Sequence, residues 1–552
     1  MNRVRKGVTA ICCLLLCAAG CMVGPSYVAP KISPPTQWRS ELSGGLSSAE
    51  SPEALAQWWS TLGDPLLTQL IERAVANNLD LRQAQARVRE ARARRGAARA
   101  NLAPTVDATG SFTHSGGNGQ ASAVPAATAQ SGPSGGVEEN LFTAGFDSSW
   151  EVDIFGGTRR SIEAAQADLE ASQEDLRDVL VSLLAEVAQN YVDVRSYQAR
   201  LAIAEANREA QEGTYRLALD RLNAGAASGL AVEQAKYNLE STRSQIPTFR
   251  IGLKQAKIRL AVLIGESPGA VDGDLAEREP IPITPGEVAV GVPADCVRRR
   301  PDVRRAERRL AAETARIGVA TADLYPKLSL TGSIGLESAS AGSLITADNY
   351  FYQLGPTLQW RVFDAGRIRQ NIKIEDAITE QKLLAYQSAV LTALQEVEDA
   401  MVAYAQEQLR RQSLQAAVDA AQNAVEISRD QFEAGLTDFQ NVLDAQRSLL
   451  SFQEQLAESD AAVTSDLIRL YKGLGGGWSS AQRSFSWLSP PPVETGRQCQ
   501  QRRPPAPRHR SMCVLSGRQD THRGAPEPFE DPPAGAACVG REKPAVGLVG
   551  SV

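Results

Sequence analysis

The chain has few of the residues on which catalytic, metal-binding and disulfide-linked proteins depend. It contains 3 histidines, 8 cysteines and 5% aromatic residues in 552 positions. His114 is the one histidine before residue 479, and Cys296 is the one cysteine between residues 22 and 478, so this part cannot form an internal disulfide. No nucleophile–base pair or cluster of metal ligands is evident. The sequence therefore predicts a protein that is not an enzyme and carries no cofactor.

Long apolar runs and excess positive charge are also missing. After the first 20 residues no run of 18 apolar residues occurs, so any membrane crossing would have to use β-strands. The net charge is −6, which argues against nucleic acid as a partner, because counterion release needs surplus Lys and Arg. Two Arg-rich stretches, 82–99 and 298–309, lack interleaved aromatics. We interpret them as solvated helix faces that pair with acidic neighbours.

The N-terminus is typical of a targeting segment. A basic start and an apolar stretch at residues 8–19 lead through small residues to Cys21. This pattern resembles a bacterial lipobox and predicts that Cys21 is acylated and anchors the chain to outer-membrane lipid. An ordinary signal peptide with an incidental cysteine is the alternative.

An internal duplication organises most of the remaining chain. Residues 80–112 align without a gap on residues 302–334. After a loop that is longer in the first copy, Trp150 aligns with Trp360. Each copy is predicted to run helix, strand, loop, strand, very long helix, tight break and helix.

Four segments of about ten residues alternate between apolar and polar side chains, the period of a strand with two different faces. They lie at 105–112, 146–154, 327–334 and 353–362. Such segments fit outer-membrane barrel strands, and amphipathic hairpins on a soluble core are the alternative. Four strands cannot close a membrane barrel, so several chains would share one. Two chains would give a barrel filled by its own side chains, and three would give about the smallest one with room for a conduit.

Two stretches, 158–223 and 367–434, contain no proline and almost no glycine. Roughly 65 helical residues extend on the order of 100 Å, and their seven-residue apolar spacing predicts coiled-coil packing. Both stretches stop at an Ala-Gly pair, with Gly225 and Gly435 suited to a helix C-terminus. Each copy is thus predicted to fold back as a helical hairpin, and the Pro- and Gly-rich segment 266–292 to be an extended connector outside the long helices.

Several motifs resemble one protein family. They are Cys21-Met22-Val23-Gly24-Pro25-Ser26-Tyr27, Trp58-Trp59 with Gly63-Asp64-Pro65-Leu66, Trp150-Glu151-Val152-Asp153-Ile154-Phe155-Gly156, Gly291-Val292-Pro293-Ala294-Asp295, Arg299-Arg300-Pro301-Asp302-Val303 with Ala306-Glu307, and Tyr471-Lys472-Gly473-Leu474 leading to Trp478. Over about residues 21–478 the chain is similar to TolC/OprM-like outer-membrane efflux proteins, in the lipoprotein branch often called NodT-type.

The resemblance implies a fold and a set of partners. The fold is a mixed α and β membrane protein, a homotrimer whose twelve-stranded β-barrel continues into a periplasmic α-helical tunnel. The partners are a periplasmic adaptor (membrane fusion) protein and an inner-membrane pump of the resistance-nodulation-division type. The function is an exit duct of a tripartite efflux system for drugs or other small solutes. Two alternatives are the outer-membrane duct of a type I protein secretion system and a non-conducting periplasmic coiled-coil scaffold.

The sequence also predicts a division of the chain. The segments are a signal peptide at 1–20, an extended anchor at 21–63, a first repeat at 64–265, the connector at 266–292, a second repeat at 293–478 and a disordered tail at 479–552.

The predicted functional residues lie at the two hairpin tips, Gly225 and Gly435. By the resemblance, Asp444 matches a position whose carboxylate helps to close the periplasmic end of the tunnel. Gln440 lies one helical turn before it, and Arg447 can pair with it. The first copy has Gln234 where the second has Asp444, so the two hairpins are not expected to contribute equally.

Overall fold

The computed structural model describes residues 22–31, 34–49, 52–117, 137–282 and 284–478. The chain divides into two units, Met1–Arg483 and Ser484–Val552, and every described residue belongs to the first. The predicted signal peptide, the predicted lipidation site Cys21 and the predicted tail lie outside the described residues, so these three remain predictions.

Two helices of 67 residues each are the longest elements of the first unit. Helix α5 covers Gly157–Asn223 and α9 covers Arg367–Glu433, so the expected long helices are present with bounds that shift by one residue. Each extends roughly 100 Å. A glycine in the left-handed region precedes each helix, Gly156 with φ 83° and Gly366 with φ 84°. That conformation turns the chain sharply from strand to helix and is easily adopted only by glycine.

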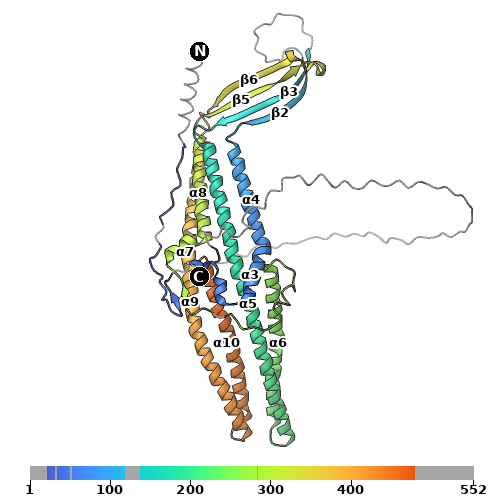
Figure 1. Ribbon diagram of the computed structural model, residues 1–552, viewed down its shortest axis with the longest axis vertical. Coiled ribbons are helices and arrows are strands. Elements are labelled where there is room, and N and C mark those ends of the chain that lie inside the picture. Colours follow the sequence, from blue (N-terminus) through green and yellow to red (C-terminus); the bar gives the residue numbers. More distant parts are fainter. Residues whose placement is uncertain (1–21, 32–33, 50–51, 118–136, 283, 479–552) are drawn as a thin grey trace, which may run out of the picture. The chain divides into compact units, whose positions relative to one another are not determined.

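Each long helix folds back on a shorter one. Helix α6 (Gly229–Leu263) packs along α5, and α10 (Phe439–Gly473) packs along α9. Helix α10 also contacts α5, so the two hairpins lie side by side (Figure 1). The expected seven-residue packing is present, because Val187, Val194, Val390 and Val397 are each at most 1% exposed.

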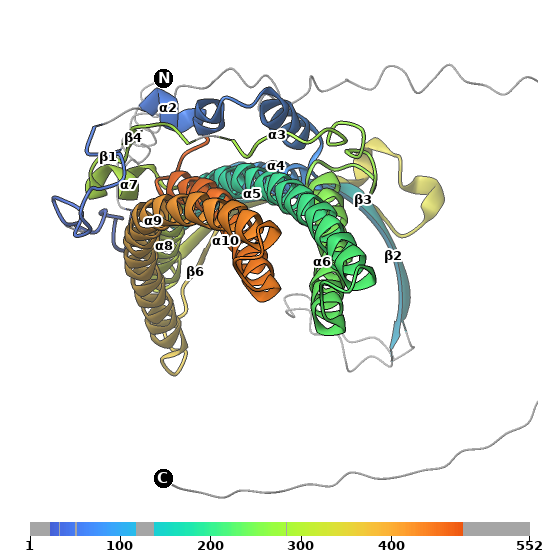
Figure 2. The ribbon, with the colours of Figure 1, turned by 90° about the horizontal axis from the view of Figure 1, so that it is seen from below.

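The helices that open the two repeats pack differently. Helix α4 (Leu79–Ala100) packs on α5, whereas α8 (Pro301–Ala322) packs against both α5 and α9. Two shorter helices precede them, α3 (Pro65–Asn77) and α7 (Pro293–Arg299). Helix α8 therefore joins the two repeats. Seen from below in Figure 2, α5 lies between α6 on one side and α10 with α9 on the other.

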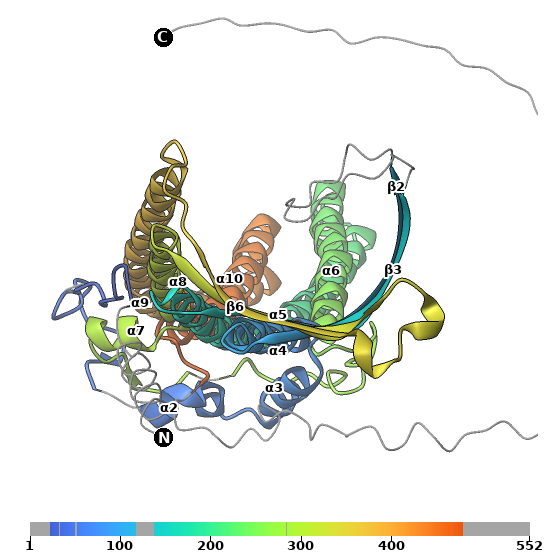
Figure 3. The same ribbon diagram turned by 90° about the horizontal axis from the view of Figure 1, so that it is seen from above.

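Four strands form one antiparallel sheet in the order β2-β3-β5-β6. They are β2 (Thr105–Gly117), β3 (Val137–Val152), β5 (Lys327–Ser338) and β6 (Tyr350–Gln359), with short 3-10 helices η2 (Ala341–Ser343) and η3 (Ala347–Asn349) between the last two. Three of the strands are longer than the alternation predicted. The central pair, β3 with β5, joins the two repeats. The sheet bends in one continuous arc when it is seen from above (Figure 3).

The strand register gathers most of the apolar residues of all four strands on one face. Ala108 is opposite Phe146, Phe146 is opposite Ile334, and Ile334 is opposite Tyr352. Cross-strand partners share a face. Phe146, Ile334 and Tyr352 are 57%, 61% and 74% exposed, so this apolar face is uncovered. The next row, Asp107, Asp147, Ser333 and Gln353, lies on the opposite, polar face.

The connector between the repeats is more structured than expected. Its strand β4 (Val288–Ala289) pairs in parallel with β1 (Leu46–Ser47) of the N-terminal segment, which continues into α2 (Pro52–Ala56) and η1 (Trp58–Leu62). Residues 268–275 form turns that bury Val271 and Leu275 completely. The fully buried Arg195 of α5 donates to the carbonyl of Glu277 and to the carboxylate of Glu279. The connector is thus anchored on α5.

No helix in the described part of the chain has both the length and the apolar character needed to cross a membrane.

Candidate functional site

Both hairpin turns are built around a glycine with positive φ. Gly225 follows α5 with φ 73°, and Gly435 follows α9 with φ 75°. In each turn the residue after the glycine donates its backbone N–H to a carbonyl oxygen in the last turn of the helix. Ala226 donates to Arg221 and Leu436 donates to Gln431, both at 2.8 Å. This pattern satisfies carbonyls that would otherwise lack partners at the helix end. The two glycines therefore have the conformational role that the sequence predicted.

Three of the predicted residues lie together on α10. The Gln440 Nε2 donates to the Asp444 Oδ1 at 3.0 Å, and Arg447 forms an ion pair with the same carboxylate. Asp444 and Arg447 keep 52% and 44% of their side chains exposed. Their spacings of three and four residues place them on one face of the helix. The structure therefore brings the half-buried Gln440 and the exposed Asp444 and Arg447 into one cluster beyond the Gly435 turn.

A contact between the two tips was not predicted. Arg221, near the end of α5, donates to the carbonyls of Phe432 and Glu433 at 3.2 and 3.4 Å. Its guanidinium also lies 4.2 Å from the centre of the Phe432 ring. A cation at the C-terminus of α9 compensates the unpaired carbonyls and the helix dipole there. Arg221 thus links the first hairpin to the second at their tips.

Apolar side chains support this link. The first hairpin contributes Ala218, Val232 and Ala235, and the second contributes Phe439 and Leu443, all of them at most 7% exposed. The Phe432 ring packs at 5.0 Å from that of Phe439. This small core holds the tips of one chain together.

Above the tips, the hairpin contact becomes polar. Gln446 of α10 donates to Thr214 of α5 at 2.9 Å, and Asn207 donates to Gln453 at 2.8 Å. Partial burial raises the pKa of Glu454, and the nearby Arg200 only partly opposes this. The Glu454 carboxylate loses hydration when the two hairpins pack together. This polar contact between the hairpins therefore stabilises the structure less than an apolar contact of similar size would.

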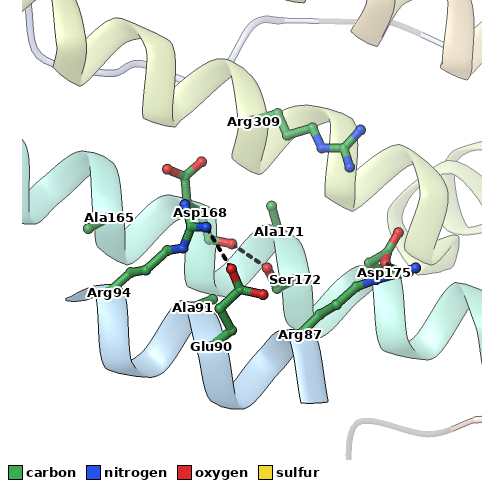
Figure 4. A pocket seen from close by; sticks show the side chains of 10 residues that line it. All are labelled: Arg87, Glu90, Ala91, Arg94, Ala165, Asp168, Ala171, Ser172, Asp175 and Arg309. Atoms are coloured by element: carbon green, nitrogen blue, oxygen red, sulfur yellow. Dashed lines mark hydrogen bonds and ion pairs between the residues drawn. The ribbon is translucent and has the colours of Figure 1, made fainter. Parts of the chain in front are cut away.

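A second cluster of charges lines a cavity of about 420 Å³ between α4, α5 and α8 (Figure 4). Arg87, Arg94 and Arg309 contribute cations, and Glu90, Asp168 and Asp175 contribute carboxylates. Arg94 pairs with Glu90 at 2.6 Å, and Asp175 is shared by Arg87 and Arg305. The expectation that the Arg-rich stretches pair with acidic neighbours is confirmed for most arginines of residues 298–309, whereas within the described part of the chain only Arg87 and Arg94 of residues 82–99 form ion pairs. We assign no ligand to this balanced cluster, which ties the three helices together.

Comparison with known proteins agrees with this architecture. A sequence model of the family described as "Outer membrane efflux protein" matches residues 70–266 and 292–476. The chain belongs to this family. The efflux family suggested by the sequence motifs is therefore confirmed.

Individual relatives cover most of this outer membrane efflux protein. Nodulation protein T of Rhizobium leguminosarum bv. trifolii is 32% identical over 83% of the chain and 94% of the relative. The pyoverdine export outer membrane protein OpmQ of Pseudomonas aeruginosa is 34% identical over 86% of the chain and 97% of the relative. The solved outer-membrane channel OprN is 34% identical, with a TM-score of 0.76 over 83% of the chain and 100% of OprN.

These matches establish the general role of the outer membrane efflux protein. It is an outer-membrane protein of a transport family, with the helical and β-stranded fold of solved outer-membrane channels. OpmQ is named as an export protein and OprN as a channel, in agreement with a chain that was not expected to be an enzyme.

Proposed function

We propose that the chain is the exit duct of a tripartite efflux system and conducts small solutes across the outer membrane. The observation that carries this proposal is the four-stranded sheet with one uncovered apolar face and one polar face. In a bilayer the apolar face contacts hydrocarbon and the polar face lines a water-filled lumen.

Completion of the barrel requires further copies of the chain. Strands β2 and β6 are the sheet edges, and each is paired on one side only. Open strand edges are not tolerated in lipid, because their backbone N–H and C=O groups would lack partners. We therefore propose a homotrimer, in which three sheets form a barrel of about twelve strands around a conduit.

The free flank of α9 supports the same assembly. An apolar stripe on this helix remains 50–68% exposed, and it consists of Leu384, Leu391, Val402, Leu409 and Ile427. The intervals of seven, eleven and eighteen residues return to nearly the same side of a helix. A stripe of this length on a free surface marks a protein contact, and the neighbouring copy would cover it in the trimer.

The hairpin tips would form the periplasmic end of the duct. We propose that the Asp444 cluster controls passage there, together with Gln440, Arg447 and the turns at Gly225 and Gly435. Asp444 is paired with Arg447 in each copy, so three copies would form a ring of charge pairs, and loss of Asp444 would leave the Arg447 cations unpaired and shift the ion preference toward anions. A periplasmic adaptor and an inner-membrane pump of the resistance-nodulation-division type would act at this end, with the acylated Cys21 anchoring the chain to the outer membrane. The relative OpmQ is named for pyoverdine export, which supports a small-molecule cargo here too.

Single-channel recording in planar lipid bilayers tests the proposal. The purified protein should conduct, and Asp444→Ala should change its conductance and cation preference, whereas Gln234→Ala, the equivalent change in the first hairpin, should not. A protein that inserts in the bilayer and never conducts would favour the scaffold alternative. Equal conductance of Asp444→Ala and the unchanged protein across pH would refute the gating role alone.

A further inference from the structure

The two repeats contain the same helices with different neighbours. Helix α4, which begins at Leu79, corresponds to α8, which begins at Pro301, at an offset of 222 residues. Helix α5, which begins at Gly157, corresponds to α9, which begins at Arg367, at an offset of 210 residues. Helix α8 packs on α9 of its own repeat and on α5 of the other, whereas within the described chain α4 packs chiefly on α5 of its own repeat. Helix α4 thus lacks the second neighbour of its counterpart, and α9 lacks a helix in the place where α8 covers α5.

The contact between α8 and α5 defines a register. Ala311 and Ala312 of α8 pack on Ala167 of α5 in one buried cluster. Arg308, which precedes this cluster on α8, pairs at 3.4 Å with Glu170, which follows it on α5. The two helices therefore run in opposite directions, and small side chains at their contact allow a close approach.

On α9 the counterparts of the α5 contact face are uncovered. Ala164 and Ala167 of α5 are 5% and 7% exposed. Their counterparts on α9 are Ile374, which is 55% exposed, and Ala377, which is exposed as well. Leu384, two turns farther along the same face, is 57% exposed. A face that is buried in one repeat and open in the other indicates a neighbour that a single chain does not supply.

The matching face of α4 is uncovered too. Ala311 and Ala315 of α8 are 7% and 1% exposed, whereas their counterparts Arg89 and Ala93 on α4 are exposed. A Cβ atom added at Gly96, one turn farther along α4, would meet nothing within 4 Å. The open faces of α4 and α9 therefore correspond, residue by residue, to two faces that bind each other inside the chain.

Helix α4 also has an excess of positive charge. It contains seven arginines and two acidic residues. In the part of the chain that the structure describes, only Arg87 and Arg94 of these arginines form ion pairs. The other arginines of α4 can therefore pair with carboxylates of another molecule.

Helix α9 places a carboxylate where these arginines would meet it. Glu380 is the counterpart of Glu170, through which α5 pairs with α8. Glu380 is exposed and forms no ion pair among the described residues. In the register of α8 on α5 it lies opposite Ala86, with Arg82 and Arg89 one turn away on either side. The two open faces are therefore complementary in charge.

We propose that α4 of one copy lies antiparallel on α9 of the next copy, in the register that α8 holds on α5 within the chain. Arg82 and Arg89 of one copy then flank Glu380 of the next and pair with it. The inference rests on the proposed function, which requires several copies of the chain, and it names the two surfaces that join them. Because these surfaces differ, the contact is head-to-tail and leads to a closed ring.

Cysteine cross-linking of the full chain in lipid vesicles tests the register. In the proposed contact, Arg89 of one copy lies against Ala377 of the next. A chain with Arg89→Cys and Ala377→Cys is oxidised and separated on a denaturing gel without reductant. We expect bands of two and three linked chains that disappear on reduction. All variants first have serine in place of three cysteines near the C-terminus, Cys499, Cys513 and Cys538.

Two further cysteine pairs are the controls. Ala167→Cys with Ala311→Cys joins α5 to α8 inside one chain, so this pair should give no linked multimers. Arg89→Cys with Leu384→Cys lies two turns out of register, which is roughly 10 Å along the helix. That separation is beyond the reach of a disulfide, so this pair should stay unlinked.

Charge reversal tests the ion pair through assembly. Arg89→Glu and Glu380→Arg each bring like charges together and should lower the assembled fraction several-fold in size-exclusion chromatography at low salt. The double variant restores opposite charges and should recover most of the assembly. The control Arg216→Glu changes an exposed arginine of the first hairpin and should assemble like the unchanged protein. Helix content by circular dichroism verifies that each variant folds.

The outcomes separate this inference from the proposed function. If the unchanged protein is an oligomer and the in-register pair does not link its copies, α4 does not lie on α9 of the next copy, and the proposed duct still stands. Multimers from the out-of-register pair would overturn the register. Folded single variants whose double variant does not recover would show that Arg89 and Glu380 do not meet. An unchanged protein that is monomeric and does not conduct would contradict the proposed function itself.

Discussion

Replacing Arg221 with methionine should raise the open probability of the proposed duct. Arg221 joins the tip of the first hairpin to the C-terminus of α9 through the carbonyls of Phe432 and Glu433. Methionine has a similar length and can pack on Phe432, but it cannot donate a hydrogen bond. We further propose that the tips of the two hairpins separate when the duct opens, so that these contacts stabilise the closed state alone.

The size of the effect follows from the geometry. The 3.2 Å hydrogen bond from a charged donor contributes about 1.5 kcal/mol in a partly exposed position, and the 3.4 Å bond contributes little. The guanidinium over the Phe432 ring at 4.2 Å adds about 0.5 kcal/mol. A total of about 2 kcal/mol corresponds to a roughly 30-fold shift of the closed-to-open ratio for each pair of hairpins in the trimer.

Single-channel recording measures this ratio directly. The matched control is Arg216→Met on the same helix, because Arg216 is 72% exposed and its one ion pair among the described residues is with Glu212, one turn away. The control should behave like the unchanged protein. If Arg221→Met and Arg216→Met have the same open probability while both remain assembled, the link between the tips does not hold the duct closed.

Three further predictions concern stability and membrane insertion. Arg300→Met should lower the free energy of unfolding by about 3 kcal/mol, because the 8% exposed guanidinium serves Asp302, Glu396 and the Gly473 carbonyl. Burial alone would raise the pKa of Asp302, but the interaction with Arg300 outweighs burial and lowers the pKa below its ordinary value. The stability from this pair is therefore present above the ordinary carboxyl pKa and is lost as the pH falls through the lowered pKa. Denaturant titrations should show this loss of stability at acidic pH in the unchanged protein and not in Arg300→Met. The pKa of Glu454 is raised, so the stability contributed by its protonated carboxyl is fully present below about pH 4.5 and is lost as the pH rises through the raised pKa. Glu454→Gln should therefore increase the free energy of unfolding at pH 8 and not at pH 4. An equal effect of the substitution at both pH values in denaturant titrations would contradict this. Ile334→Arg on the apolar sheet face should oppose insertion into liposomes by about 2–4 kcal/mol, whereas Ser333→Arg on the polar face should insert normally.

Much of the candidate site could be predicted from the sequence because it is local. Gln440, Asp444 and Arg447 follow one another at helical spacing, so their contact needs only a helix. Gly225 and Gly435 mark the turns because a left-handed residue after a long helix is usually glycine. The link through Arg221 could not be predicted, because 211 residues separate it from Phe432. The sequence held one indication of this link, because Arg221 is the one basic residue in the last turn of α5.

The sequence by itself determined the duplication, the two long helices, the alternating strands and the family. These features depend on periodicity and turn residues within short stretches, which local backbone geometry translates directly into helices and strands. Only the tertiary structure decided which elements meet. Pairing of β3 with β5 joins the repeats and merges four alternating patterns into one apolar face. Packing of α8 between α5 and α9, anchoring of the connector by Arg195 and contact of the hairpin tips likewise join residues far apart in the chain. Such contacts depend on complementary surfaces of distant segments, which no local pattern encodes.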